Sequence, residues 1–411
     1  MDLRKDAERI IQDAISASLP DAAVINALRD EDLSGGRLLL VAIGKAAWTM
    51  AKAACDVLGS MVQEGVVITK YGHSKGSLPN MSIFEAGHPV PDENSFRATE
   101  QAIKMVSGLS DKDKVLFLIS GGGSALFEKP LVSPEELESI TKQLLSSGAS
   151  IVEINTIRKR LSAVKGGKFA RLCEPAQVYS VVLSDIIGDP LDMIASGPAY
   201  PDSSTTQEAE NIIKKYGITI SEKTEQLLKV DTPHQLGNVK TKVTGSVTQL
   251  CRSAEGTCRD LGYEPVILTA SLSCEAREAG SFLGSIAEHY RTAGKSIAFI
   301  AGGETVVHVK GKGKGGRNQE LALSAAIRLS GIDNAALFSV GSDGTDGPTD
   351  AAGGYVDGTT VNVLKNKGID AYRMLENNDA YNALKECDGL VVTGPTGTNV
   401  NDLTVLLIKN I

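Results

Sequence analysis

Short apolar runs alternate along the chain with longer segments in which apolar residues recur at helical spacing. The run RLLLVAI at residues 37–43 predicts a strand that is buried on both faces. Segments 45–58 and 133–148 have the spacing of amphipathic helices. Further strands are expected at residues 65–69, 82–87, 115–120 and 178–185. Because strands alternate with helices, the pattern predicts parallel sheets covered by helices on both faces.

A polar stretch at residues 229–240 (KVDTPHQLGNVK) interrupts this alternation and marks the best candidate for a domain boundary. A second alternating set follows, with strands expected at residues 265–270, 296–303, 304–310, 335–344 and 403–410. The sequence therefore predicts two α/β domains, residues 1–236 and 237–411.

Composition narrows the class of protein. The chain has 411 residues, with 42 Lys and Arg against 50 Asp and Glu, and this net charge of −8 argues against a nucleic-acid binder. The six cysteines form no CxxC pair, which favours reduced thiols over a disulfide framework or a zinc site. No apolar run approaches the roughly 20 residues needed to cross a bilayer. We expect a soluble, cytoplasmic protein.

Residues able to do chemistry follow several of the expected strands. Lys45 comes directly after the strand at 37–43, and Gly121, Gly122 and Gly123 follow the strand at 115–120. In open α/β sheets, ligands bind outside the carboxyl ends of the strands, and a glycine turn can present backbone N–H groups to an anion. Each residue alone also fits a tight turn or a helix cap. Carboxylates in the same kind of position are Asp185, Asp189, Asp343, Asp346 and Asp350.

The loop VKGKGKGGRNQE at residues 309–320 is locally basic within an acidic protein. The chain contains no Walker A string, but residues 311–316 match the G-x-G-x-x-G pattern of dinucleotide sites. The alternative is a solvated hairpin tip whose lysines extend into water. Arg317 opens the helix that follows, and its planar guanidinium would suit bidentate contact with an anion.

Taken together, these motifs resemble those of the glycerate 2-kinase family, whose C-terminal portion is called the MOFRL domain. The strings that carry the resemblance span residues 43–402 in the expected order. They are IGKAAWTMA, GHPVPDENS, SGGGSAL, NTIRKRLSAVKGGKFA, GDPLDMIASGPAYPDSST, GGETVVHVKGKGKGGRNQE, GSDGTDGPTDAAGG and TGPTGTNVNDL. One departure is Arg160, where the family pattern leads us to expect histidine.

The resemblance implies an ATP- and Mg²⁺-dependent kinase that phosphorylates the 2-hydroxyl of D-glycerate to give 2-phosphoglycerate. It also implies an N-terminal Rossmann-like domain with a doubly wound sheet, a smaller C-terminal α/β domain and an active site in the cleft between them. The family's suspected catalytic lysine and arginine fall on Lys45 and Arg317.

Phosphoryl transfer depends on positioning and on neutralising charge, which suggests a role for each candidate residue. Lys45 is assigned to the transferred phosphoryl group, and Arg317 to that group or to the glycerate carboxylate. Asp189 is the candidate general base. The remaining candidates are an anion cradle of Ser120, Gly121, Gly122, Gly123 and Ser124, metal ligands Asp185, Asp189 and Glu304, and polar lining from Asn318, Thr398, Asn399 and Asn401. Whether the cradle holds phosphate or carboxylate stays open, and the asparagines fit loop or cap structure equally well.

Two other functions remain compatible with the residues. An NAD(P)H-dependent hydroxypyruvate reductase is supported only by residues 311–316. A non-catalytic protein that binds a sugar acid or nucleotide would explain the glycine turns, but not two cations together with several carboxylates. The expected partners are the small molecules glycerate and ATP. The sequence leaves the oligomeric state open, a homo-oligomer included.

Overall fold

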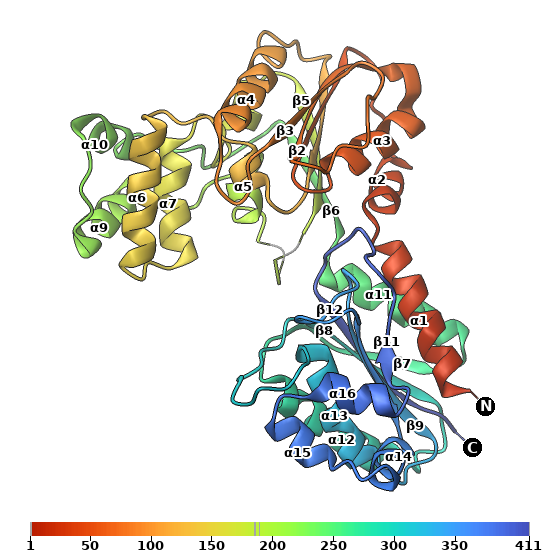
Figure 1. Cartoon of the computed structure of the whole chain (residues 1–411). Coiled ribbons are helices and arrows are strands. Elements are labelled where there is room, and N and C mark those ends of the chain that lie inside the picture. The colour runs from red at the N-terminus through yellow and green to blue at the C-terminus, as the bar shows by residue number, and fades with distance from the viewer. Residues whose placement is uncertain (1, 185, 189, 411) are drawn as a thin grey trace. The chain divides into compact units, whose positions relative to one another are not determined.

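The computed structural model describes residues 2–184, 186–188 and 190–410, which form two compact units. The N-terminal unit comprises Ala23–Ser184 and Asp189–Thr244, and the C-terminal unit comprises Met1–Ala22, Asp185–Gly188 and Gly245–Ile411. Figure 1 shows the elements of both units. Asp185 and Asp189 lie outside the described residues.

The units divide the chain differently from the 236/237 boundary expected from the sequence. Strand β6 (Val239–Gly245) lies next to β5 (Gln177–Leu183) in the N-terminal sheet, so that sheet continues past the polar stretch. Helix α1 (Leu3–Ala17) belongs to the C-terminal unit, where the Asp6 carboxylate accepts hydrogen bonds from Tyr263 (2.7 Å) and Lys409 (2.6 Å). These partners are hundreds of residues away along the chain, so no local pattern indicates them.

The N-terminal sheet has the strand order β3-β2-β1-β4-β5-β6, which is the order of a Rossmann fold. Its other strands are β1 (Leu38–Ile43), β2 (Val62–Lys70), β3 (Met81–Ala86) and β4 (Lys114–Ile119). β1 pairs in parallel with both β2 and β4, and every residue of β1 is buried. Helices α3 (Ala47–Leu58) and α4 (Glu93–Met105) cover opposite faces (Figure 1). The expected parallel, doubly wound sheet is confirmed for this unit.

A group of four helices extends this unit beside the sheet (Figure 1). They are α6 (Pro134–Ser146), α7 (Ile151–Leu161), α9 (Thr206–Tyr216) and α10 (Glu222–Leu228). A serine or threonine hydroxyl caps the N-terminus of each helix, and leucines and isoleucines from the four helices form one shared core.

The C-terminal sheet has the order β11-β10-β9-β12-β8-β7, and its direction corrects the expectation of a parallel sheet. Its strands are β7 (Glu264–Leu272), β8 (Ile297–Gly303), β9 (Ala335–Gly341), β10 (Gly353–Asp357), β11 (Leu390–Val391) and β12 (Asp402–Ile408). The last strand, β12, inserts antiparallel between β8 and β9. β10 also runs antiparallel to β9, because the loop between them carries no crossover helix.

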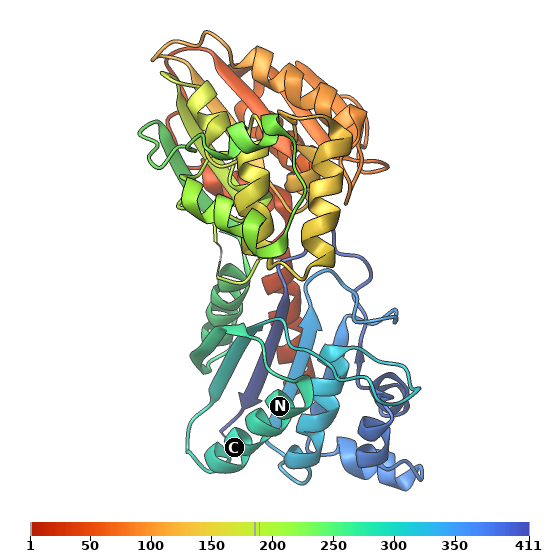
Figure 2. The same ribbon diagram turned by 90° about the vertical axis from the view of Figure 1, so that its left-hand side faces the viewer.

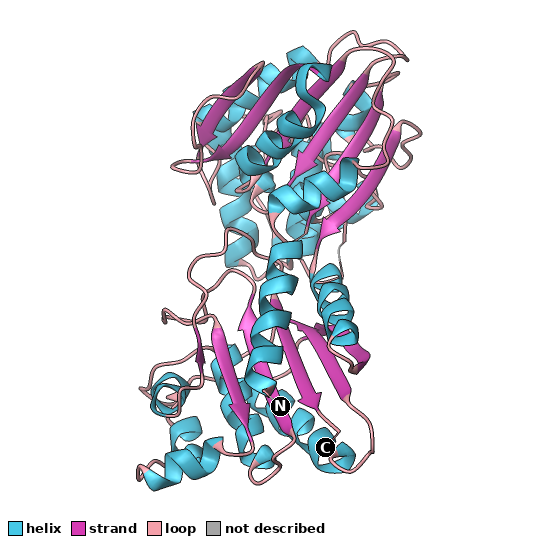
Figure 3. Ribbon diagram, turned by 90° about the vertical axis from the view of Figure 1, so that its right-hand side faces the viewer, coloured by secondary structure: helices cyan, strands magenta, loops and turns pink. Residues whose placement is uncertain are grey.

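Helices cover both faces of this sheet. Figure 3 shows α1 and α11 (Val247–Asp260) side by side over one face. Helices α12 (Ala276–Tyr290) and α13 (Arg317–Leu329) pack over the other face (Figure 2), where their apolar residues share a core with the strands.

The strand expected at residues 304–310 does not form. β8 ends at Gly303, where an added Cβ would lie 2.2 Å from the carbonyl oxygen of Leu272. The chain then continues as a loop, joined to Glu275 only through a single bridge at Val306. The alternating apolar and polar residues at 304–310 belong to a loop with exposed valines and not to a hydrogen-bonded strand of the sheet.

The packing of α12 on α13 makes a testable prediction. An added Cβ at Gly280 would lie 2.2 Å from the backbone oxygen of Leu321, so Gly280→Ala should destabilise the protein by about 1–3 kcal/mol. The matched control is Gly256→Ala on α11, where nothing lies within 4 Å, and it should be neutral or stabilising by up to about 1 kcal/mol. Urea unfolding measures both changes, and equal effects would contradict the close helix contact.

Candidate functional site

The point where the strand order of the N-terminal sheet reverses lies between β1 and β4. At such a switch point, the loops after the two strands leave in opposite directions and open a crevice for a ligand. Lys45 follows β1, and the Gly121–Gly123 turn follows β4. The fold therefore brings these two predicted elements to the same edge of the sheet.

Hydrogen bonds join the two loops directly. The Lys45 backbone N–H donates to the Gly121 carbonyl (2.9 Å), and the Ala46 N–H donates to Ser120 Oγ (3.1 Å). Gly44 has a φ of +110°, and an added Cβ would lie 2.2 Å from Ser120 Oγ, so only glycine fits there. The Ser120 hydroxyl is buried and also bonds the Ile43 carbonyl at 3.1 Å. Ser120 thus holds the loops together instead of facing a ligand.

Lys45 extends from this junction with an exposed side chain. Within the part of the chain that the structure describes, its ammonium group forms no ion pair. The Gly121–Gly123 turn lies against its stem, because an added Cβ at Gly122 would be 3.3 Å from Lys45 Cγ and 3.0 Å from His88 Cδ2. The backbone N–H groups from Gly121 to Ser124 donate no hydrogen bond to a described residue. An available cation beside available N–H groups is an arrangement suited to an anion.

Helix α7 fixes the segment that follows the glycine turn. Ser124 Oγ lies 3.0 Å from Ser196 Oγ, and the Ser196 hydroxyl donates to Asn155 Oδ1 at 3.1 Å. The Arg158 guanidinium donates to the Ser124 carbonyl at 3.1 Å. Ala195 and Ser196 both adopt left-handed backbone conformations, which are unusual for these residue types. Strain of this kind is retained where the surroundings hold it in place, as they often do near functional sites.

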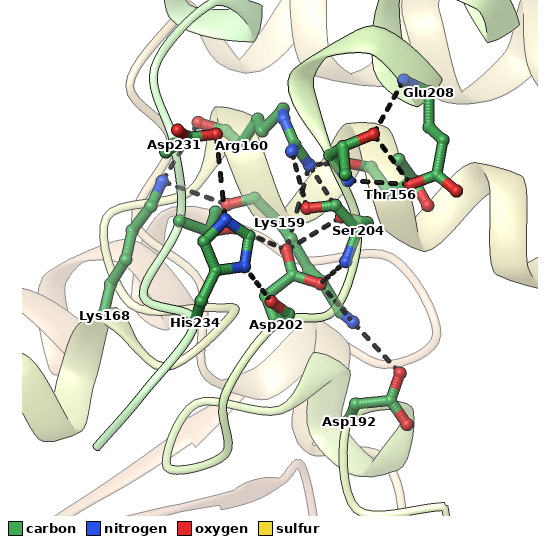
Figure 4. Close-up of polar contacts among 12 residues, drawn as sticks. Thr156, Lys159, Arg160, Lys168, Asp192, Asp202, Ser204, Glu208, Asp231 and His234 are labelled. Carbon is green, nitrogen blue, oxygen red and sulfur yellow. Dashed lines mark hydrogen bonds and ion pairs between the residues drawn. The ribbon is translucent and has the colours of Figure 1, made fainter. Parts of the chain in front are cut away.

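A buried charge network lies at the C-terminal end of α7, as Figure 4 shows. Lys159 Nζ is 3.2 Å from the Asp202 carboxylate and 3.4 Å from the Asp192 carboxylate. Burial alone would raise the pKa of Asp202, but the Lys159 charge and hydrogen bonds from Thr232 and Ser204 hold it below its usual range. Sequence analysis missed this network, because the run NTIRKRLSAVKGG does not show which of its cations are buried.

Arg160, the departure from the family pattern, belongs to the same network. Its guanidinium is buried and donates to Ser204 Oγ (2.8 Å) and to the Ser204 carbonyl (3.0 Å). It also lies 3.8 Å from Asp202 (Figure 4). Its contacts support the fold of the N-terminal unit.

In the C-terminal unit, two carboxylates already accept hydrogen bonds from the guanidinium nitrogens of Arg317. Nε and Nη2 donate to the two oxygens of Asp402 (2.6 and 3.0 Å), and Nη1 donates to Glu304 Oε1 (2.9 Å). The Asp402 side chain is 7% exposed and the Glu304 side chain is 51% exposed. Asp402 therefore fixes the arginine from the central strand β12, whereas Glu304 is a surface partner.

Asp346 supports the same arginine by capping its helix. Its carboxylate accepts hydrogen bonds from the backbone N–H groups of Asn318 (3.2 Å) and Gln319 (2.9 Å) at the start of α13. Burial raises the pKa of Asp346 to about 7. Asn318 is also buried, and Ser339 donates to its side-chain oxygen at 2.6 Å. Asn318 is thus placed in the interior of the unit rather than on a ligand-binding surface.

The basic loop that contains the G-x-G-x-x-G string is held by a neighbouring loop. The N–H groups of Lys310 and Gly311 donate to Asn378 Oδ1 (2.8 and 2.9 Å). Lys312 N–H and Lys314 N–H donate to side-chain oxygens of Asn377 (3.1 Å) and Asp379 (2.9 Å). The glycines allow this close approach: an added Cβ at Gly311 would lie 2.1 Å from the Asn377 carbonyl oxygen. Because these donors are occupied, the loop is not a dinucleotide-binding turn.

A pocket of about 680 Å³ lies beside Arg317 in the C-terminal unit. This volume is in the range of small-molecule sites. Val306, Val309 and Pro348 supply apolar lining, and Arg317 and Asp346 supply charge.

The three polar residues near the C-terminus connect their loop to itself and to Ser18 at the end of α1. Thr398 Oγ1 donates to the Ser18 carbonyl at 2.8 Å. Asn399 Oδ1 accepts from the Asn401 N–H at 3.3 Å, and the Asn401 carbonyl accepts from Ser342 at 3.0 Å. The loop interpretation of these residues is therefore supported by contacts.

Magnesium prefers oxygen ligands and usually keeps several waters, so a kinase can bind it through phosphates and only one or two carboxylates. No group of three or more His, Cys, Asp or Glu suited to a metal occurs among residues 2–184, 186–188 and 190–410. Glu304 and Asp192, each partly exposed, are described carboxylates that fit this mode of binding.

Among residues 2–184, 186–188 and 190–410, no helix is long and apolar enough to span a membrane.

The raised pKa of Asp346 makes a prediction about stability. Its pKa rises from 3.8 to about 7 on folding, so its contribution to stability is full below pH 3.8 and is lost as the pH rises through 7. The free energy of unfolding of the wild type relative to Asp346→Asn should therefore be greatest near pH 4 and fall towards pH 7. Urea unfolding across this range measures the difference, with Asp343→Asn in the same loop as the control. A difference independent of pH would contradict the burial of this carboxyl.

Comparison with known proteins places these features in a family. Residues 6–229 match a domain of unknown function, DUF4147, and residues 297–402 match the MOFRL family. The chain is 55% identical to D-glycerate 2-kinase of Thermotoga maritima, over 99% of this chain and 98% of that protein. A crystal structure of T. maritima glycerate kinase superposes with a TM-score of 0.93 at 54% identity and covers 99% of both chains.

Another relative has a different name. A putative hydroxypyruvate reductase of Agrobacterium vitis is 38% identical, over 98% of this chain and 94% of that protein. The matches to the Thermotoga maritima kinase cover 99% of this chain in both sequence and structure. The chain belongs to the glycerate 2-kinase family and carries a MOFRL region at residues 297–402.

Proposed function

We propose that this protein transfers the γ-phosphoryl group of ATP to the 2-hydroxyl of D-glycerate, giving 2-phosphoglycerate and ADP. The observation that carries the proposal is the exposed ammonium of Lys45, held at the switch point of a Rossmann-like sheet beside a glycine turn with available N–H groups. The kinases named among its relatives support the same reaction.

Lys45 neutralises the transferred phosphoryl group. Phosphoryl transfer requires an oriented nucleophile and compensation of the charge that spreads over the phosphoryl oxygens. A lysine whose ammonium has no carboxylate partner among the described residues can provide that compensation without first breaking an ion pair.

Arg317 binds the phosphoryl group or the glycerate carboxylate by exchanging one partner. Glu304 is the more exposed of its two carboxylates, and it holds only Nη1. A substrate anion would replace Glu304 there, while Asp402 keeps the guanidinium in place through Nε and Nη2. A fixed fork loses little freedom on binding an anion.

Mg²⁺ would neutralise the phosphates of ATP when bound, and Asp185, Asp189 and Glu304 are its proposed protein ligands. Asp189 is also the proposed general base for the substrate hydroxyl. Both aspartates follow β5, whose carboxyl end lies next to that of β4 in the sheet. We place the reaction in the cytoplasm, in keeping with six cysteines that are free thiols in the structure.

The reductase function receives no support from the site. Its only sequence feature was the string at residues 311–316, and the N–H groups of that loop are bound to Asn377, Asn378 and Asp379. A protein that only binds its ligand would give no role to Lys45 and Arg317, or to the contacts that hold each of them in place.

The first test measures ADP release. The wild type should release ADP from ATP only when D-glycerate is present, and Lys45→Met should lower kcat/KM about 100- to 1000-fold. Lys52→Met is the control, because Lys52 lies on the same segment but is exposed and paired with Asp56. Oxidation of NADH with hydroxypyruvate, without ADP release, would contradict the proposal.

The second test concerns the fork of Arg317. Arg317→Lys keeps the charge but loses the bidentate geometry, so kcat/KM should fall about 10- to 150-fold, as for loss of a charged hydrogen bond. Arg328→Lys, on the exposed side of the same helix, should leave activity unchanged. Unchanged activity of Arg317→Lys would contradict the role in anion binding, and unchanged activity with a lowered unfolding midpoint would assign Arg317 to structure alone.

A further inference from the structure

The chain of hydrogen bonds behind the glycine turn fixes the direction of one hydroxyl proton. Asn155 Nδ2 faces Met193 Sδ at 3.7 Å, which leaves Asn155 Oδ1 to accept from the Ser196 hydroxyl at 3.1 Å. A serine hydroxyl has one proton, so Ser196 has none left to donate. With the Asn155 amide oriented in this way, Ser124 is the donor in the 3.0 Å contact between Ser196 and Ser124.

The surroundings prevent this arrangement from reversing easily. Ser196 is fully buried and Asn155 is nearly so. An added Cβ at Gly123 would lie 2.7 Å from Ala195 Cβ, so the turn and the segment that carries Ser196 are in direct contact. The Arg158 guanidinium holds the Ser124 backbone from the other side at 3.1 Å.

Ser124 itself is only partly buried, and its oxygen then has only lone pairs to offer to a ligand. Phosphate and carboxylate oxygens are acceptors and gain nothing from such an atom. A hydroxyl group, which can donate, is complementary to it. The same turn lies against the stem of Lys45, so a hydroxyl bound here would be close to the residue assigned to the phosphoryl group.

We propose that Ser124 Oγ accepts a hydrogen bond from the 2-hydroxyl of the hydroxy acid, so that the glycine turn of the N-terminal unit is the subsite of the phosphoryl acceptor and not of the ATP phosphates. The assignment of this hydroxyl as the nucleophile rests on the proposed function. Ser124 takes no proton in the reaction. In the bound substrate it holds the hydroxyl by accepting this hydrogen bond, and as the oxygen attacks phosphorus the hydroxyl proton passes to the proposed general base, Asp189.

The test removes the hydroxyl from the protein and from the ligand in turn. Calorimetry without nucleotide compares D-glycerate with 3-hydroxypropanoate, which lacks the 2-hydroxyl. The wild type should bind D-glycerate about three- to tenfold more tightly, which is the usual effect of one neutral hydrogen bond. In Ser124→Ala this ratio should fall to about one through weaker binding of D-glycerate, with the KM for ATP unchanged.

Two further variants keep the test decisive. Ser107→Ala removes an exposed hydroxyl just after α4 that bonds the Ile103 carbonyl of that helix, and this variant should keep the wild-type ratio. Ser196→Ala leaves the Ser124 oxygen in place but releases its proton, so the ratio should fall only in part, and this variant serves if Ser124→Ala does not fold.

Three results would overturn the proposal: a wild-type ratio of one, a ratio retained in Ser124→Ala, or a Ser124→Ala defect confined to the KM for ATP or to the Mg²⁺ requirement. These results are separate from failure of the proposed function, which would appear as wild-type protein that binds D-glycerate with the expected ratio but does not phosphorylate it.

Discussion

The junction between the turns after β1 and β4 is the constraint on which the N-terminal part of the site depends. Ser120 bonds the end of β1 through its backbone N–H and its hydroxyl, and it accepts a hydrogen bond from the turn that carries Lys45. Gly44 leaves no space for a side chain at this contact. A parallel sheet brings the two strand ends together, and this junction then fixes the position of the lysine against the glycine turn.

In the C-terminal unit, buried polar groups fix the position of Arg317 in a similar way. Asp402 lies at the start of a central, fully buried strand, and Asp346 caps the helix that Arg317 opens. In both units, a cation thus extends from a position that buried polar groups determine. Side chains held in this way need little reorganisation when an anion binds, which is how preorganised sites stabilise a transition state.

The fold of the N-terminal unit could be predicted from the sequence because buried parallel strands are unbroken apolar runs, as at residues 37–43 and 115–120. The direction of β12 could not, since an apolar strand has the same pattern in either orientation. Lys45 and the glycine turn were predictable because strand ends are visible in the sequence.

Several supporting contacts could not be predicted, because they join segments that no local pattern connects. They are the partners of Arg317, the cap of α13 from Asp346, and the pairing of Lys159 with Asp202 and Asp192. The glycines at residues 311–316 show the opposite case. They match the pattern of a dinucleotide-binding turn, but the structure explains them by the close packing of this loop against Asn377.

The position of the new phosphate ester tests the central claim most directly. Phosphorus NMR of the product formed from ATP and D-glycerate distinguishes an ester on the secondary oxygen from one on the primary oxygen by its coupling to carbon-bound hydrogen. Membership in the glycerate 2-kinase family and the proposed role of Ser124 predict 2-phosphoglycerate as the product. Formation of 3-phosphoglycerate, or no transfer to D-glycerate at all, would contradict the account.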